Sequence, residues 1–207
     1  MIPLMIKRNT LKLIAASAVG LCVAGLFSAC SPTDPSFTAI DITGADYAKD
    51  FSLTDHNGQI RTLKDFQGKI VMVFFGYTQC PDVCPTSMTE MVAIKKLLGA
   101  DGDRLQGLFV TIDPERDKPE MLKAYMEAFD PSFLALVPTI DKLAVLAKDY
   151  KVYYKKVDGP TPTSYTMDHT AGSYVYDTQG KLRLFTRYGT KPELTTADLK
   201  ILLQQAR

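Results

Sequence analysis

An unbroken apolar run at residues 70–75 leads into Gly76 and then into two cysteines, Cys80 and Cys84. Apolar residues at every position suit a strand that is covered on both faces, so the run predicts the central strand of an α/β domain. The helix expected next would carry the thiols at positions i and i+4, which lie on one helical face. That spacing suits two thiolates on one soft metal ion and also permits a disulfide. The alternative is a pair of small buried core residues.

The first 29 residues are predicted to be a targeting segment and not part of the fold. Three basic residues lie between positions 7 and 12, and residues 13–29 are apolar or small, which is the pattern of a signal peptide. Cys30 follows small residues, as in a bacterial lipoprotein, so we expect cleavage after residue 29 and lipidation of Cys30. An uncleaved helical anchor and simple secretion are the alternatives. All three place the domain outside the cytoplasm.

Residues 30–45 are predicted to form a tether and residues 46–207 a single globular domain. If the leader is removed and Cys30 is lipidated, Cys80 and Cys84 are the only thiols that remain. Oxidising compartments usually close such a pair as a structural disulfide. A domain of this size buries enough surface to be stable without one. The pair is therefore predicted to be functional.

The net charge argues against a nucleic-acid partner. Three of the 24 Lys and Arg residues lie in the leader, which leaves 21 against 23 Asp and Glu, or a net charge of −2. Nucleic-acid binding normally needs a basic patch or stripe, and none is visible along the sequence.

Hydrophobic periodicity after residue 50 predicts strands and helices in alternation. A β-hairpin is expected at residues 51–63, because Asn57-Gly58 suits a tight turn. Helix starts are expected at the capping box of Ser87 and Glu90 and at Asp117. The remaining predictions are strands at 108–112, 134–137 and 152–157, a hairpin at 173–185, helices ending near 99, 129 and 150, and a last helix from 195.

This order, with the thiols after the first central strand, is the thioredoxin-like arrangement. The N-terminus of its helix carries a partial positive charge, which is expected to lower the pKa of the thiols. The segment before the second hairpin faces the thiols in such a fold, and here it is a long polar loop that ends at His169. We therefore expect His169 to be a third ligand. His56, beside the predicted Asn-Gly turn, is expected to be a solvated loop residue.

Two thiolates and one imidazole favour copper. Soft sulfur ligands select Cu(I), and imidazole accepts both copper oxidation states. Structural zinc prefers four protein ligands, one more than this set provides. Catalytic zinc with three ligands and a water stays open, although no motif supplies a carboxylate as its base. A thiol peroxidase is excluded, because the Thr and Pro that precede its reactive Cys are absent at Cys80 and Cys84.

The cysteine segment and two later motifs together resemble the Sco/SenC family of copper-delivery proteins. They are residues 74–86, residues 113–117 and residues 168–170. The resemblance extends from about residue 51 to the C-terminus. It implies a thioredoxin-like α/β domain with an added N-terminal β-hairpin, attached to the bacterial membrane on its periplasmic side.

The resemblance also implies copper bound by Cys80, Cys84 and His169 and a role in building the dinuclear copper centre of cytochrome c oxidase. The expected partner is the oxidase subunit that holds this centre, with another periplasmic copper chaperone or a thiol reductase as further candidates. A carrier of this kind need not be an enzyme. The alternative is a thiol:disulfide oxidoreductase that keeps the subunit's cysteines reduced through a redox-active Cys80–Cys84 disulfide. His169 favours copper binding, because a reductase needs no imidazole facing its thiols.

The acidic residues of the segment at 113–117 have two open roles. Asp117 is expected to cap a helix, and Pro114 is expected to fix the loop. In the Sco/SenC family this loop lies near the metal. The resemblance therefore implies that Asp113 and Asp117 support the metal ligands or dock a partner.

Overall fold

The computed structural model describes residues 36–161 and 164–205. The predicted signal peptide, residues 1–29, and the predicted lipidation site Cys30 lie outside these ranges. Within them, no helix has both the length and the apolar character needed to cross a membrane.

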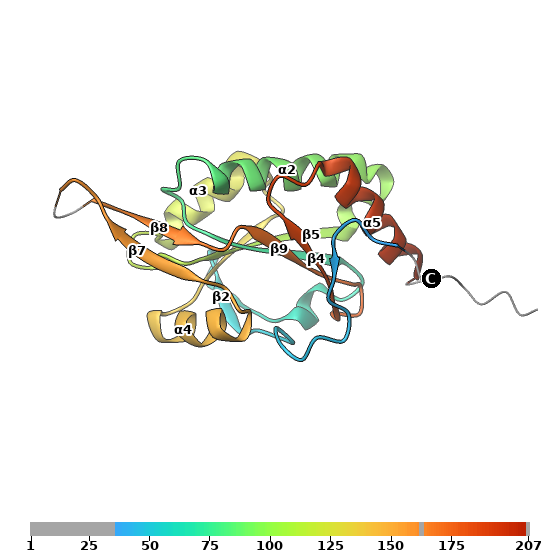
Figure 1. Ribbon diagram of the computed structural model, residues 1–207, viewed down its shortest axis with the longest axis horizontal. Helices are drawn as coiled ribbons and strands as arrows, with labels where there is room; N and C mark the ends of the chain where they lie inside the picture. The colour runs from blue at the N-terminus through green and yellow to red at the C-terminus, as the bar shows by residue number, and fades with distance from the viewer. Residues whose placement is uncertain (1–35, 162–163, 206–207) are drawn as a thin grey trace, which may run out of the picture. The chain divides into compact units, whose positions relative to one another are not determined.

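A mixed eight-stranded sheet forms the centre of the domain, in the order β1-β10-β9-β4-β5-β6-β2-β3 (Figure 1). Its strands are β1 (Ile40–Asp41), β2 (Leu53–Asp55), β3 (Ile60–Arg61), β4 (Ile70–Gly76), β5 (Leu105–Thr111), β6 (Leu134–Val137), β9 (Gly172–Tyr176) and β10 (Leu182–Arg187). Strands β4, β5 and β6 run parallel, and β9 pairs with β4 in the antiparallel sense. The predicted α/β class is confirmed, and so is the early hairpin, formed by β2 and β3.

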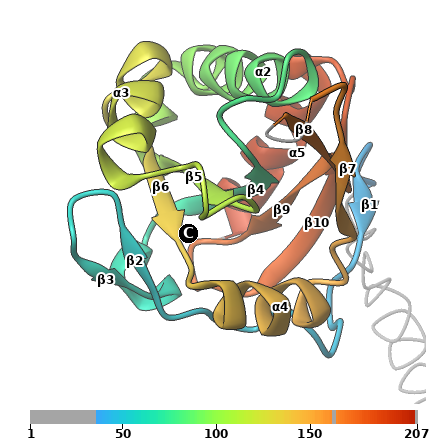
Figure 2. The same cartoon turned by 90° about the vertical axis from the view of Figure 1, so that its left-hand side faces the viewer.

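Among the described residues, four α-helices cover the sheet. They are α2 (Val83–Leu97), α3 (Pro119–Phe129), α4 (Ile140–Asp149) and α5 (Pro192–Gln205). Two short 3-10 helices precede strands of the sheet: η1 (Leu63–Phe66) lies before β4, and η2 (Gly99–Arg104) lies before β5. Figure 2 shows α2 and α3 on one side of the sheet and α4 on the other. Every residue of β4 and β5 is buried as a result, as the apolar run predicted.

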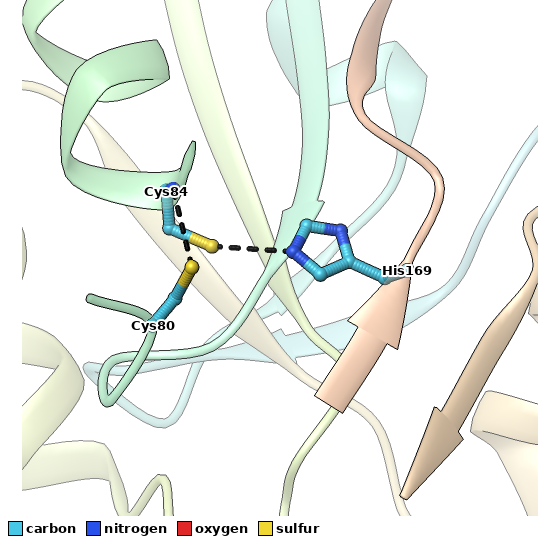
Figure 3. A group of neighbouring side chains, drawn as sticks. All are labelled: Cys80, Cys84 and His169. Atoms are coloured by element: carbon cyan, nitrogen blue, oxygen red, sulfur yellow. Dashed lines mark hydrogen bonds between the residues drawn. The ribbon is translucent and has the colours of Figure 1, made fainter. Parts of the chain in front are cut away.

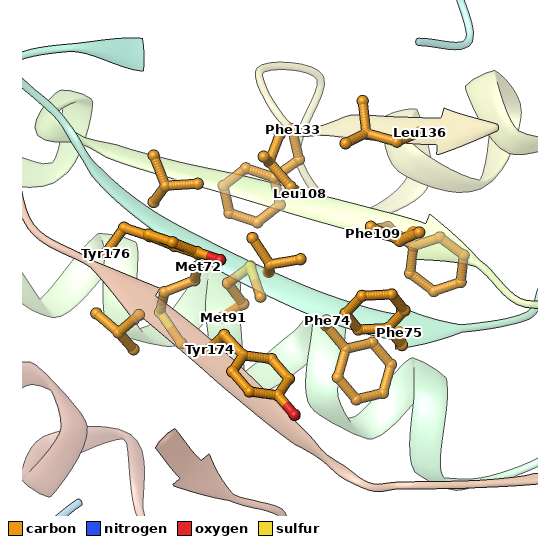
Figure 4. Packing of buried hydrophobic residues seen from close by; sticks show 14 of the residues in the cluster. Met72, Phe74, Phe75, Met91, Leu108, Phe109, Phe133, Leu136, Tyr174 and Tyr176 are labelled. Carbon is orange, nitrogen blue, oxygen red and sulfur yellow. The ribbon is translucent and has the colours of Figure 1, made fainter. Parts of the chain in front are cut away.

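Aromatic side chains dominate the core around β4, β5 and β9 (Figure 4). The Tyr174 hydroxyl donates to the Tyr150 carbonyl oxygen, and the Tyr176 hydroxyl donates to the Ala48 carbonyl oxygen over 2.7 Å. The hydroxyls of Tyr174 and Tyr176 thus keep hydrogen-bond partners while their rings fill the core.

Both predicted helix starts are wrong. Helix α2 begins at Val83, and Ser87 is buried within it rather than capping it. Helix α3 begins at Pro119 after Lys118, while the carboxylate of Asp117 accepts hydrogen bonds from neighbouring segments instead. In both places contacts within the folded domain replace the local cap that the sequence pattern offers.

Part of the predicted tether belongs to the folded domain. Strand β1 lies within residues 30–45 and pairs with β10. The backbone N–H groups of Thr38 and Ala39 both donate to the carboxylate of Asp198 on α5, over 3.0 and 2.8 Å. Residues 38–41 therefore belong to the folded domain, which was predicted to begin at residue 46.

A separate two-stranded sheet takes up part of the predicted polar loop before the second hairpin. It consists of β7 (Tyr154–Asp158) and β8 (Tyr165–His169). Strand β7 overlaps the strand predicted at residues 152–157, whereas β8 was not predicted. None of the residues in either strand is fully buried, so the apolar signal along the sequence is weak. The hairpin extends beyond the main sheet (Figure 1) and ends at His169.

Candidate metal centre

Three side chains from separate segments converge at one end of β4. Cys80 lies in the loop after β4, Cys84 in the first turn of α2, and His169 at the end of β8 (Figure 3). Their ligand atoms all lie within 4.8 Å of one another. The structure therefore brings together all three residues that the sequence predicted as metal ligands.

Gly76 allows the loop to pass directly over the Cys84 thiol. A Cβ atom at this position would lie 2.8 Å from Cys84 Sγ and within 3 Å of the rings of Phe74 and Phe109. Real Cβ atoms do not approach other atoms so closely, so any larger residue would displace the thiol or the rings. The glycine at the end of the apolar run is thus required by the site.

Asp117 holds the loop that carries Cys80. Its carboxylate accepts from the backbone N–H of Thr78 over 3.1 Å, from the Thr78 hydroxyl over 2.5 Å and from the Thr111 hydroxyl over 2.6 Å. Burial raises the pKa of this carboxyl, and the hydrogen bonds oppose that shift. Asp117 therefore fastens the loop to the end of β5 instead of capping α3.

The two thiols have different surroundings. Cys84 is 0% exposed, and Cys80 is half-buried. Burial raises the pKa of Cys84 well above its usual range, and the backbone N–H of Tyr77 only partly opposes this. The prediction that the helix N-terminus lowers the pKa is therefore wrong for Cys84, because loss of water outweighs the helix dipole. A metal that binds Cys84 at neutral pH has to displace its proton.

The imidazole of His169 is oriented as a neutral ligand. Its Nδ1 lies 3.0 Å from the carbonyl oxygen of Thr170, which can only accept, so Nδ1 carries the proton. Nε2 is then the unprotonated nitrogen and lies 3.5 Å from Cys84 Sγ, whose thiol can donate to it; loss of the thiol proton leaves the Nε2 lone pair available to a metal. Burial lowers the pKa of His169, which keeps the ring neutral. The rings of Phe74 and Tyr77 pack edge-on against it, each with centroids 6.0 Å apart.

Two sulfurs and one imidazole nitrogen fit a single copper ion. Soft thiolates suit Cu(I), and the free Nε2 suits either oxidation state. Among the described residues the group contains no carboxylate, so a catalytic zinc ion would find no base within it.

The remaining predicted residues lie around this group and not in it. Asp113 is 3% exposed, and its carboxylate is occupied by Arg116 and by the Tyr165 hydroxyl, which donates over 2.9 Å. His56 is half-buried rather than solvated, because its Nδ1 accepts from the backbone N–H of Ala135 over 3.1 Å. The contributions of Arg116 and Tyr165 were not predicted, since a single Arg and a single Tyr form no local pattern.

Alkylation rates should separate the two thiols. At pH 7, iodoacetamide should modify Cys84 in the Cys80→Ser variant at least about tenfold more slowly than it modifies Cys80 in the Cys84→Ser variant. The reagent attacks the thiolate, and the thiolate fraction falls about tenfold for each unit by which the pKa exceeds the pH. The rate at Cys84 should still be rising above pH 9, since a raised pKa moves ionisation to higher pH. Both variants unfolded in urea serve as the control and should react alike. Equal rates at Cys80 and Cys84 in the folded variants would contradict the burial of Cys84.

Comparison with known proteins gives a consistent result. The SCO1/SenC family model matches residues 41–204. The SCO2-like protein of Rickettsia felis is 32% identical over 181 residues, which cover 84% of this chain and 88% of that protein.

Two solved structures bear on the fold and carry copper. The structure of Bradyrhizobium japonicum ScoI with copper bound has a TM-score of 0.67 and 41% identity, covering 74% of this chain and 97% of that one. The structure of yeast Sco1 with copper bound has a TM-score of 0.67 and 29% identity, and the match covers 82% of this chain and 90% of that one. The predicted thioredoxin-like fold is confirmed by this likeness. The chain belongs to the SCO1/SenC family, as its three motifs predicted.

Proposed function

We propose that this protein binds copper through Cys80, Cys84 and His169 and delivers it to the dinuclear copper centre of cytochrome c oxidase. The observation that carries the proposal is the free Nε2 of His169 held 3.5 Å from Cys84 Sγ, with Cys80 Sγ in the same group. The two copper-bound relatives of the same family support copper as the cargo. The expected partner is the oxidase subunit that receives the metal.

The donor set accounts for capture of Cu(I). In the free protein Cys84 is a neutral thiol and His169 a neutral imidazole, so no bare charge is buried. Binding displaces the thiol proton and puts Cu(I) in its place. The positive metal ion then compensates the thiolate charge that burial would otherwise disfavour.

The exposure of Cys80 determines the direction of release. Cys84 is fully buried, whereas Cys80 is half-buried and lies on the loop before α2. A ligand from the receiving subunit therefore reaches copper from the Cys80 side. Three protein donors leave the metal able to accept that ligand before a donor from this protein departs, so transfer needs no free ion.

Thiol reduction is the second candidate, because both thiols are free and close together. Disulfide exchange is slow when the departing thiol has a high pKa, and burial raises the pKa of Cys84. The oriented imidazole of His169 has no use in such a reaction. Both observations favour copper delivery as the primary function.

Attachment to the periplasmic face of the membrane through lipidated Cys30 forms part of the proposal. Its support is the leader pattern at residues 1–29 together with the small residues before Cys30. Cys30→Ser should abolish the mass increase from acylation and change the processing of the precursor, as seen by mass spectrometry of membrane fractions. Cys22→Ser serves as the control and should be processed normally. Full-length, unmodified wild-type protein in the membrane would instead indicate a helical anchor.

Copper titration tests the ligand set. The reduced protein should bind one copper ion, and the protein with a Cys80–Cys84 disulfide should bind none, because both thiolates are lost. Affinity for Cu(I) should rise at least about tenfold per pH unit between pH 6 and 8, since the Cys84 proton is displaced below its pKa. His169→Ala should weaken Cu(II) binding more than Cu(I) binding, because the harder ion depends more on imidazole. Full copper binding by the oxidised protein would disprove the site.

In cells, His169→Ala separates copper delivery from thiol reduction. His169→Ala leaves both thiols in place, so disulfide chemistry should survive. Oxidase assembly at low copper should nevertheless fall nearly as far as in the variant lacking both cysteines. His56→Ala, which removes the only other histidine of the chain, is the matched control and should assemble normally. Normal assembly in His169→Ala would favour the reductase.

A further inference from the structure

The hairpin that carries His169 has few main-chain ties to the rest of the domain. Among the described residues, β7 and β8 pair only with each other. At the base of the hairpin, Thr170 donates its backbone N–H to the Tyr153 carbonyl oxygen, and Tyr153 donates its own to the Thr170 hydroxyl, both over 2.9 Å. Side-chain contacts must therefore set how β8 lies against the thiols.

Arg116 makes these contacts with three segments at once. Its Nε donates to the carboxylate of Asp113 in its own loop. Its Nη1 donates to the Tyr165 carbonyl oxygen on β8 over 2.9 Å and to Gln79 Oε1 over 3.1 Å. Gln79 is the neighbour of Cys80, so one guanidinium joins the strand of His169 to the loop of Cys80.

Tyr165 is held at its ring and its hydroxyl as well as at its carbonyl. The Arg116 guanidinium lies 3.5 Å from the centroid of its ring, and its hydroxyl donates to Asp113 over 2.9 Å. Tyr165 and His169 are four residues apart on β8, so their side chains lie on the same face of the strand. A fixed Tyr165 therefore fixes the face that presents the imidazole.

The site of Arg116 suits a guanidinium and not a general positive charge. The side chain is only 18% exposed, and its contacts with Asp113, Gln79 and the Tyr165 carbonyl use a planar fork of donors. An ammonium group is a point charge with no plane to stack on Tyr165. The Nη2 of Arg116 is buried and forms no hydrogen bond with any of the described residues, so the contacts of Nε and Nη1 hold the guanidinium in place.

We infer that Arg116 is a positioning residue of the metal centre, which clasps Tyr165 of β8 to the Cys80 loop and thereby sets the distance from the His169 imidazole to the thiols. Loss of this clasp frees the hairpin and leaves a site with two thiolates and a displaced imidazole. The inference rests on the proposed function only in treating His169 as a copper ligand.

Amide hydrogen exchange of the purified, copper-free full chain tests the clasp without any metal. Exchange across residues 165–169 should be at least about tenfold faster in Arg116→Gln than in wild type, because local opening controls this rate. Arg61→Gln is the matched control: Arg61 is also partly buried and pairs with Asp55, but lies on the edge strand β3. It should leave exchange in β8 unchanged.

Copper binding supplies the second readout. In Arg116→Gln, electron paramagnetic resonance of the Cu(II) form should lose nitrogen coupling as in His169→Ala, and the Cu(II) dissociation constant should rise about tenfold. Cu(I) binding should weaken less than Cu(II) binding, and the count of two free thiols should remain as in wild type. Arg116→Lys keeps the charge and should still resemble Arg116→Gln, because the planar contacts are lost. Tyr165→Phe removes only the hydrogen bond from the hydroxyl to Asp113. It should change hydrogen exchange in β8 and nitrogen coupling in the same direction as Arg116→Gln, but by a smaller amount.

Separate results test the role of Arg116 and the proposed copper ligands. Wild-type exchange in β8 and wild-type nitrogen coupling in Arg116→Gln would overturn the inference, as would full rescue by Arg116→Lys. If Arg116→Gln does not fold, wild-type hydrogen exchange in β8 and wild-type nitrogen coupling in Tyr165→Phe would overturn the inference instead. Copper binding that is identical in His169→Ala and wild type would refute the proposed ligand set, while hydrogen exchange would still decide whether the clasp holds β8.

Discussion

A buried thiol and a half-buried neutral imidazole face each other in this protein, and the rest of the site is arranged around that pair. Cys84 Sγ and His169 Nε2 are 3.5 Å apart, and burial favours the neutral form of both groups. Neither group could be charged there without a partner, because desolvation of a lone charge is costly. A soft cation that replaces the thiol proton resolves this constraint, which is why the geometry fits copper better than disulfide exchange.

Two buried carboxylates support this pair from the same loop after β5. Asp117 binds Thr78 and so holds the cysteine side of the site. Asp113 binds Arg116 and Tyr165 and so holds the histidine side. Side-chain hydrogen bonds from one loop thus position both the cysteine loop and β8, and precise ligand geometry depends on such supporting contacts.

The sequence was most informative where a local pattern coincides with burial. The apolar run of β4 predicted a covered central strand, and the order of elements predicted that His169 would face the thiols. Strand β8 and the bonds of Asp117 could not be predicted in this way, because contacts from distant segments decide them. The raised pKa of Cys84 was missed for the same reason, since helix position is visible in a sequence whereas the depth of burial is not.

X-ray absorption at the copper edge of the reduced, Cu(I)-loaded protein tests the central claim most directly. It identifies the atoms bound to the metal without relying on affinity or on activity in cells. A centre built from Cys80, Cys84 and His169 gives two sulfur neighbours and one nitrogen neighbour, with the nitrogen lost in His169→Ala and kept in His56→Ala. A shell of sulfur alone in the wild type, unchanged by His169→Ala, would contradict a centre built from Cys80, Cys84 and His169.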